Sequence, residues 1–91
     1  MREEIFRAYN EAKIDDDSIV FFRVNNYYVA LFDDAKRVSN ELHIPLLTKN
    51  IDDSDIIYIV IQEDNLVSVL VRLDRCTEGN YKLIETVEFI L

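Results

Sequence analysis

The spacing of apolar residues changes along the chain, and the first period is helical. Glu3 and Glu4 begin this segment, where negative charge suits the positive end of a helix dipole. Between Arg2 and Lys13 the apolar residues follow the i, i+3, i+4, i+7 spacing of one helix face: Ile5, Ala8, Tyr9 and Ala12. The pattern predicts an N-terminal helix over Arg2 to Lys13.

The next two apolar segments predict an antiparallel hairpin. Ile19 to Val24 and Tyr27 to Phe32 are rich in β-branched and aromatic residues, and Asn25-Asn26 between them tolerates the positive φ of a tight turn. Both faces of this hairpin are apolar, so we expect part of it to be covered by a second copy or a partner.

A second helix is predicted after the hairpin, ending before Pro45, because the residue before a proline is disfavoured in the α region. Either Asp33 or Asp34 is expected to cap its first turn. Its apolar side carries three residues: Ala35, Val38 and Leu42.

The second half of the chain gives one clear strand and one ambiguous segment. Ile56 to Ile61 is an uninterrupted β-prone run, which predicts a central strand covered on both faces. Leu66 to Leu73 fits a helix capped by Asp64 or Asn65, and it also fits one face of a strand. Glu78-Gly79-Asn80 predicts a turn into a last strand, Tyr81 to Leu91, with one shared face: Tyr81, Leu83, Val87, Phe89 and Leu91.

Composition limits the function. A chain of 91 residues forms one domain, 1–91, and its net charge of −8 repels phosphate. The acidic runs Asp15-Asp16-Asp17 and Asp52-Asp53-Ser54-Asp55 are interpreted as solvated loops. No apolar run is long enough to cross a bilayer and no signal peptide is expected, so the predicted location is cytoplasmic.

The titratable residues predict no enzyme, no metal site and no bound cofactor. His43 and Cys76 are the only residues of their kinds, which leaves no nucleophile and base to assemble and no zinc ligand set. The acidic runs lack the spacing of a calcium loop. A chain whose only glycine is Gly79 contains no phosphate-binding glycine loop, so no nucleotide partner is expected.

One continuous segment of the chain reads Phe21-Phe22-Arg23-Val24-Asn25-Asn26-Tyr27-Tyr28-Val29-Ala30-Leu31-Phe32-Asp33-Asp34-Ala35-Lys36-Arg37. It resembles the N-terminal mismatch-recognition domain of the MutS mismatch-repair proteins, which has the general form Phe-Tyr-Arg-Met-Gly-Asp-Phe-Tyr-Glu-Leu-Phe-Tyr-Asp-Asp-Ala-Lys-Arg. The match has no gap, and the similarity continues through Leu42, Ile44, Leu47, Thr48 and Lys49. The resemblance implies a stand-alone α+β domain in which helices flank a mixed β-sheet with an N-terminal hairpin, and it favours a helix over Leu66 to Leu73.

The resemblance also implies DNA-contact residues. In the family a Phe wedges beside a mispaired base and a Glu two positions later hydrogen-bonds that base; Tyr27 and Val29 stand at these positions. A basic loop follows Leu-Thr-Lys in the family, whereas here Asn50 and three aspartates follow Lys49. The candidate DNA contacts are therefore Asn25, Asn26, Tyr27 and Lys49.

Two functions remain open at this point. The first is binding of mismatched duplex DNA within a larger assembly whose other subunits supply positive charge. The second is a protein-interaction or self-associating module that kept the fold and lost DNA recognition. Because phosphate neutralisation dominates duplex affinity, the acidic chain is expected to bind duplex DNA only weakly by itself.

Overall fold

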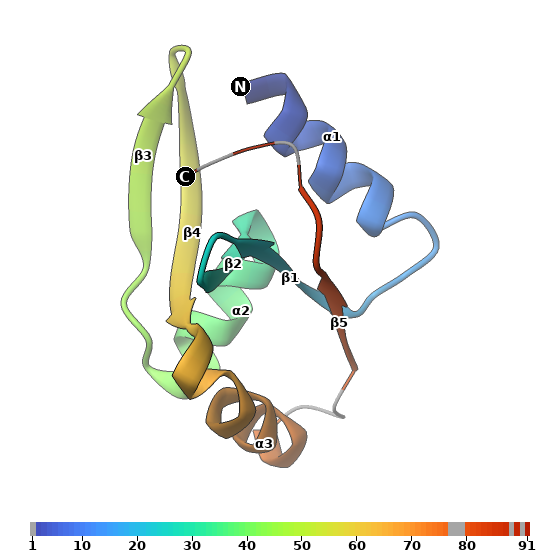
Figure 1. Ribbon diagram of the computed structural model, residues 1–91, viewed down its shortest axis with the longest axis vertical. Helices are drawn as coiled ribbons and strands as arrows, with labels where there is room; N and C mark the ends of the chain where they lie inside the picture. The colour runs from blue at the N-terminus through green and yellow to red at the C-terminus, as the bar shows by residue number, and fades with distance from the viewer. Residues whose placement is uncertain (1, 77–79, 88, 90) are drawn as a thin grey trace.

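The computed structural model describes residues 2–76, 80–87, 89 and 91. Within these residues five strands form one sheet, and three helices and one short 3₁₀ turn pack around it (Figure 1). In chain order these are α1 (Arg2–Ala12), β1 (Ile19–Val24), β2 (Tyr27–Leu31), α2 (Phe32–Leu42), β3 (Leu47–Ile51), β4 (Ser54–Gln62), η1 (Glu63–Asn65), α3 (Leu66–Cys76) and β5 (Tyr81–Ile84).

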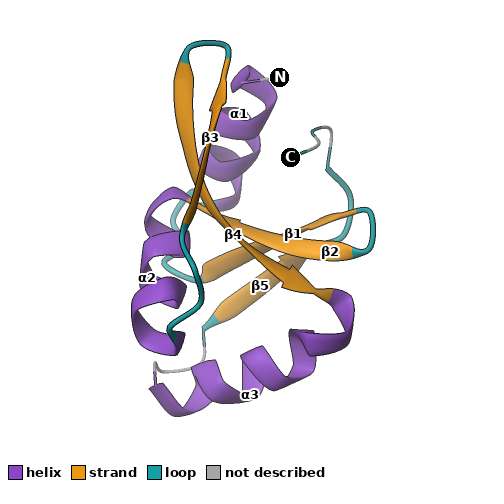
Figure 2. Cartoon of the chain, turned by 90° about the vertical axis from the view of Figure 1, so that its left-hand side faces the viewer, coloured by secondary structure: helices purple, strands orange, loops and turns teal. Residues whose placement is uncertain are grey.

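The sheet is mixed, as the resemblance implies. Its strand order is β3-β4-β2-β1-β5, in which β5 runs parallel to β1 and the other pairs are antiparallel. Helices α2 and α3 lie on one side of it, and α1 lies on the other (Figure 2). The predicted α+β class with flanking helices is confirmed.

Each face of the sheet has its own hydrophobic core, because neighbouring residues of a strand point to opposite faces. The first core packs under α2 and α3 and contains Ile19, Phe21, Tyr28, Ala30, Ala35, Val38, Leu42, Ile59, Ile61, Leu66, Val69 and Leu73. The second packs under α1 and contains Ile5, Ala12, Val20, Phe22, Val24, Val29, Leu31, Ile51, Ile56 and Phe89. Both faces of the β1–β2 hairpin are therefore covered by this chain itself, which removes the sequence argument for self-association.

The predicted hairpin turn is confirmed. Val24 pairs with Tyr27, which leaves Asn25 and Asn26 as the two turn residues, and Asn25 takes a φ of 56°. Strand β2 ends one residue earlier than predicted. Phe32 instead begins α2 with a φ of 52° and stacks on Phe6 of α1, with ring centroids 5.0 Å apart.

The predicted cap of α2 is wrong. Leu31 occupies the N-cap position without a side-chain hydrogen bond, and the Asp34 side chain turns into the protein. The predicted end before Pro45 is right: His43 adopts the left-handed C-cap conformation, and its N–H donates to the Ser39 carbonyl at 2.9 Å.

The acidic run at 52–55 is only partly a loop. Asp52 and Asp53 form a two-residue turn, with φ values of 50° and 65°, between β3 and β4, while Ser54 and Asp55 belong to β4. Strand β3 is a polar edge strand that the apolar pattern does not indicate. The Ile56 to Ile61 segment does contribute to both cores, although β2 is the middle strand of the sheet.

Leu66 to Leu73 is helical, as the resemblance favours, and Asp64 and Asn65 form the preceding 3₁₀ turn. Glu78 and Gly79 of the expected turn lie outside the described residues. The last strand ends at Ile84 and not at Leu91, so the predicted single face is wrong. Leu83 packs against the α2–α3 core, whereas the later residues pack under α1: Val87, Phe89 and Leu91.

Candidate nucleic-acid interface

The β1–β2 turn presents Asn25 and Asn26 to solvent. Their backbone carbonyls accept hydrogen bonds from two neighbours: the Arg23 Nε donates to Asn25 at 3.2 Å, and the Glu63 N–H donates to Asn26 at 3.3 Å. The turn is therefore anchored on the 3₁₀ turn that precedes α3. It leaves two amide side chains, and no charge of its own, at the tip.

Arg23 lies beside this turn, and two carboxylates pair with it. Its guanidinium lies 3.0 Å from Glu63 Oε1 and 3.5 Å from Glu85 Oε2, and it donates to the Tyr28 hydroxyl at 3.3 Å. The hydrogen bond with Tyr28, followed by the charge of Glu63, raises the pKa of Arg23. One positive charge between two negative ones gives the tip a net negative charge, which disfavours a phosphate backbone.

Tyr27 and Val29, at the Phe and Glu positions of the family, both lie on the face of β2 that packs under α1. Val29 is fully buried in the core under α1, so its position cannot offer any side chain to a base. Tyr27 is half-buried on the same face, and its hydroxyl donates to the Leu91 carbonyl at 2.8 Å. Phe89 of this same C-terminal segment packs edge-on against Phe22, with ring centroids 5.6 Å apart. The segment thus covers the face of β2 from which a wedge would have to project.

Lys49 lies far from the other three candidates. It belongs to β3 and pairs with Ile56, whereas Tyr27 pairs with Gln62 at the opposite end of β4. Ile56 and Gln62 are six steps apart along β4, which corresponds to about 20 Å at ~3.3 Å per residue. The structure brings Asn25, Asn26 and Tyr27 together and leaves Lys49 at the edge of the sheet.

Asp34, interpreted from the sequence as a cap, is instead the centre of a buried polar cluster. Its carboxylate accepts from the Val20 N–H at 3.0 Å and pairs with Lys13 Nζ at 2.9 Å, while the same Nζ donates to the Ser18 carbonyl. The side chain of Asp34 is only 3% exposed. The cluster joins the end of α1, the start of β1 and the first turn of α2, and no local sequence signal indicates such a long-range pair.

A family model of MutS domain I matches residues 3–75. The chain belongs to the MutS domain I family. A comparison with the curated proteins finds no match. MutS domain I is a recognition domain and not a catalytic one, and its role in the family is mismatch recognition in DNA repair.

Among the residues that the structure describes, no group of three or more His, Cys, Asp or Glu side chains is placed to hold a metal ion. None of the described helices combines the length and apolar character that a membrane span requires.

Proposed function

We propose that this MutS domain I chain is a non-enzymatic binding module that docks on a protein partner and does not hold duplex DNA by itself. It keeps the fold of the mismatch-recognition domain while its recognition surface has changed. Any contribution to mismatch repair then comes through the assembly in which the module is held.

The observation that carries the proposal is the state of the β2 face that would meet a mispaired base. Val29 is buried, and Tyr27 is hydrogen-bonded to the Leu91 carbonyl. A wedge must recover the cost of unstacking a base step, which is a few kcal/mol, from stacking worth ~1–3 kcal/mol and from phosphate contacts. With Arg23 bound by Glu63 and Glu85, the tip supplies few such contacts.

The second candidate function is duplex binding within an assembly whose other subunits carry positive charge. One observation favours it: Tyr27 is partly exposed and lies directly beside the turn. In this case the module adds a contact to DNA that other subunits already hold.

Fluorescence anisotropy with a labelled duplex tests the proposal. We expect G·T-mismatched and fully paired duplexes to bind equally, with a dissociation constant no tighter than ~10⁻⁴ M at physiological salt, the weak end of non-specific binding. Saturation at micromolar protein, with a preference for the mismatch, would overturn the proposal.

A pair of charge variants sharpens the test at low salt, where weak binding is measurable. Glu63→Gln with Glu85→Gln releases Arg23 at the tip, while Glu3→Gln with Glu41→Gln changes the net charge equally at exposed helix positions. If duplex contact is only non-specific, both double variants gain affinity to the same small extent. A clear excess for the tip variant would instead favour the second candidate function.

A further inference from the structure

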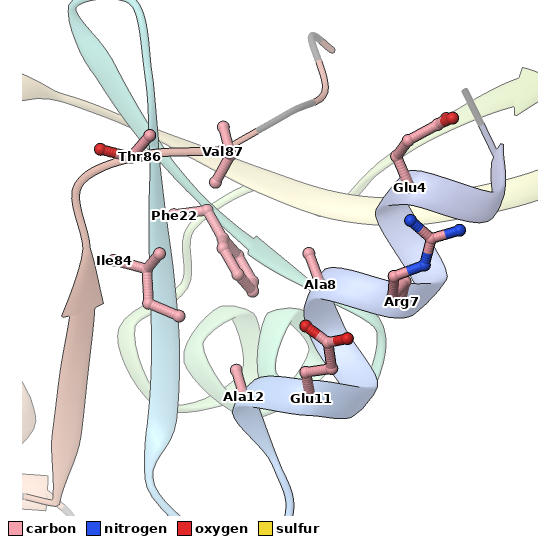
Figure 3. A pocket seen from close by; sticks show the side chains of 9 residues that line it. All are labelled: Glu4, Arg7, Ala8, Glu11, Ala12, Phe22, Ile84, Thr86 and Val87. Carbon is pink, nitrogen blue, oxygen red and sulfur yellow. The ribbon is translucent and has the colours of Figure 1, made fainter.

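Two clefts of this chain differ in the charge of their walls. The first, of about 500 Å³, opens between α1 and the segment that follows β5, and Arg7 stands there between Glu4 and Glu11 (Figure 3). The second measures about 330 Å³ and lies between the end of β4 and α3. Arg72 is the only charged residue that lines this β4–α3 cleft, and the other polar lining residues are neutral: Gln62, Asn65 and Ser68. The first cleft has walls of mixed charge, whereas the β4–α3 cleft favours an anionic group.

Strand β4 extends beyond its partner β3 at this cleft. The pairing of β3 with β4 ends at Leu47 and Tyr58, whereas β2 pairs with β4 as far as Gln62. The loop that precedes β3 leaves the edge of the sheet and leads back to α2 (Figure 2). On the side away from β2, residues 59–62 of β4 therefore have no neighbouring strand among the residues that the structure describes.

Val60 carries the unpaired backbone groups of this edge. Ile51 and Ser54 close a two-residue turn in which both central residues have positive φ, so they form a hydrogen-bonded pair. Every second residue of β4 from Ser54 therefore directs its N–H and C=O toward the β3 side, and Val60 is the first of them beyond Tyr58. No backbone hydrogen bond joins Val60 to the loop before β3. An extended chain supplies the donors and acceptors that such an edge lacks.

Arg72 has no acidic partner among the residues that the structure describes. One of its N–H groups donates to the Leu42 carbonyl at 2.9 Å, which leaves further N–H donors for a ligand. The two acids of the 3₁₀ turn do not compete for it: Glu63 pairs with Arg23 at 3.0 Å, and Asp64 does not line the cleft. The chain's net charge of −8 opposes an anion at a distance, but salt screens exposed charges beyond about 8 Å. A carboxylate matches the planar guanidinium at close range.

We propose that an extended acidic segment of a partner protein adds a strand to β4 at Val60, antiparallel to it, and places a carboxylate on Arg72. The proposal rests on the proposed function, since it names the chemistry of the partner on which the module docks. Val60 packs on the α1 side of the sheet, and Ile61 packs on the α2–α3 side. The partner residue opposite Val60 is therefore apolar, and its two neighbours, on the side of α3, are acidic. Main-chain hydrogen bonds supply affinity, and Arg72 selects the sign of the charge.

Amide chemical-shift mapping by NMR tests the proposal with two synthetic peptides. The first is acetyl-Val-Glu-Val-Glu-Val-amide, and the second replaces both glutamates with lysine. We expect saturable shifts at Val60, Gln62 and Ser68 with the acidic peptide, and none at these residues with the basic one. Equal shifts with both peptides, or no shift at these residues, would overturn the proposal.

N-methylated peptides distinguish strand addition from a contact of side chains alone. In an antiparallel pair, the central valine opposite Val60 directs its N–H to β4, whereas both glutamates direct theirs to solvent. A methyl group on the nitrogen of the central valine should therefore lower the affinity about tenfold, and one on the nitrogen of the first glutamate about twofold or less. Equal effects of the two methyl groups would contradict a strand added at Val60.

A pair of charge variants tests the role of Arg72. Arg72→Glu should weaken binding of the acidic peptide about tenfold, whereas Arg7→Glu, an equal charge change on the other side of the sheet, should weaken it about twofold or less. Arg72→Glu also loses the hydrogen bond to Leu42, so the amide signals of α2 check its fold, and the methylated peptides test the unchanged protein. Equal effects of the two variants would contradict the assignment of the carboxylate to Arg72.

The outcome is separable from that of the proposed function. Failure of the acidic peptide to bind, with duplex binding also absent, overturns the proposed strand addition alone. Specific binding of mismatched duplex overturns the proposed function whatever the peptide does.

Discussion

The two halves of the segment that resembles MutS, residues 21–37, differ in burial and in the contacts that they make. In the second half, Asp34 is buried and binds Lys13 and the Val20 N–H, so it holds α1, β1 and α2 together. In the first half, the turn at Asn25-Asn26 is exposed and flanked by carboxylates, and Tyr27 is bound to Leu91. Asp34 therefore contributes to the fold, whereas the turn residues lie at the surface, so under the proposed function the recognition surface changes while the fold is kept.

The largest change in the free energy of unfolding is expected in the second half of this segment, at Asp34. Asp34→Ala leaves Lys13 and the Val20 N–H without their partner in a site that is nearly closed to water. Removing one partner of a buried ion pair typically costs ~3–5 kcal/mol, and we expect about 3 kcal/mol here because Lys13 is partly exposed. Urea denaturation followed by circular dichroism measures the change.

Asp33→Ala is the matched control for this variant. The Asp33 side chain is 87% exposed and lies 3.9 Å from Lys36, so its loss should change the free energy of unfolding by no more than about 0.5 kcal/mol. Similar losses for the two variants would show that Asp34 does not have the structural role described above.

A smaller change in stability is expected in the first half of the segment, at Tyr27. Tyr27→Phe removes the hydroxyl that donates to the Leu91 carbonyl, which should lower the free energy of unfolding by about 1 kcal/mol. Tyr81→Phe removes a hydroxyl from an exposed residue and should leave the stability unchanged. Thermal unfolding of the three proteins compares them, and a stability of Tyr27→Phe equal to that of the parent would mean that the segment does not hold Tyr27 in solution.

The smallest change in stability is expected at Asp16, in an acidic loop outside residues 21–37. Hydrogen bonds from Ser18, with Lys82 as a further partner, lower the pKa of Asp16 from 3.8 to about 2. Because the folded-state pKa is the lower one, the stabilisation is complete above about pH 4 and is lost as the pH falls through 2. Asp16→Asn should therefore be less stable than the parent at pH 6 and match it near pH 2. A difference that persists unchanged to pH 2 would exclude the carboxylate as its source.

Local signals in the sequence predict the first half of the fold well. The Asn25-Asn26 pair and the apolar strands around it specify the hairpin, and Pro45 marks the end of α2. Strand β3 is missed because its exposed residues Thr48, Lys49 and Asn50 show no apolar alternation, and its pairing with β4 depends on two aspartates with positive φ.

The candidate site is harder to predict because its state depends on distant contacts. The contact between Tyr27 and Leu91 spans 64 residues, and the Lys13–Asp34 pair spans 21. Spacing along the sequence gives Tyr27 and Val29 the same face of a strand, but it does not say what covers that face. The charge of the chain, in contrast, is fixed by composition alone, and the prediction of weak duplex affinity follows from it.

Under the proposed function, the Asn25-Asn26 end of this MutS domain I fold does not hold a duplex by itself. The most direct test is an NMR titration of the labelled protein with a G·T-mismatched duplex at physiological salt. We predict that the amide signals of Asn25, Asn26 and Tyr27 stay in place at ~100 μM duplex, apart from small changes shared with a fully paired duplex. Saturable shifts of these three signals, seen with the mismatch only, would contradict the account.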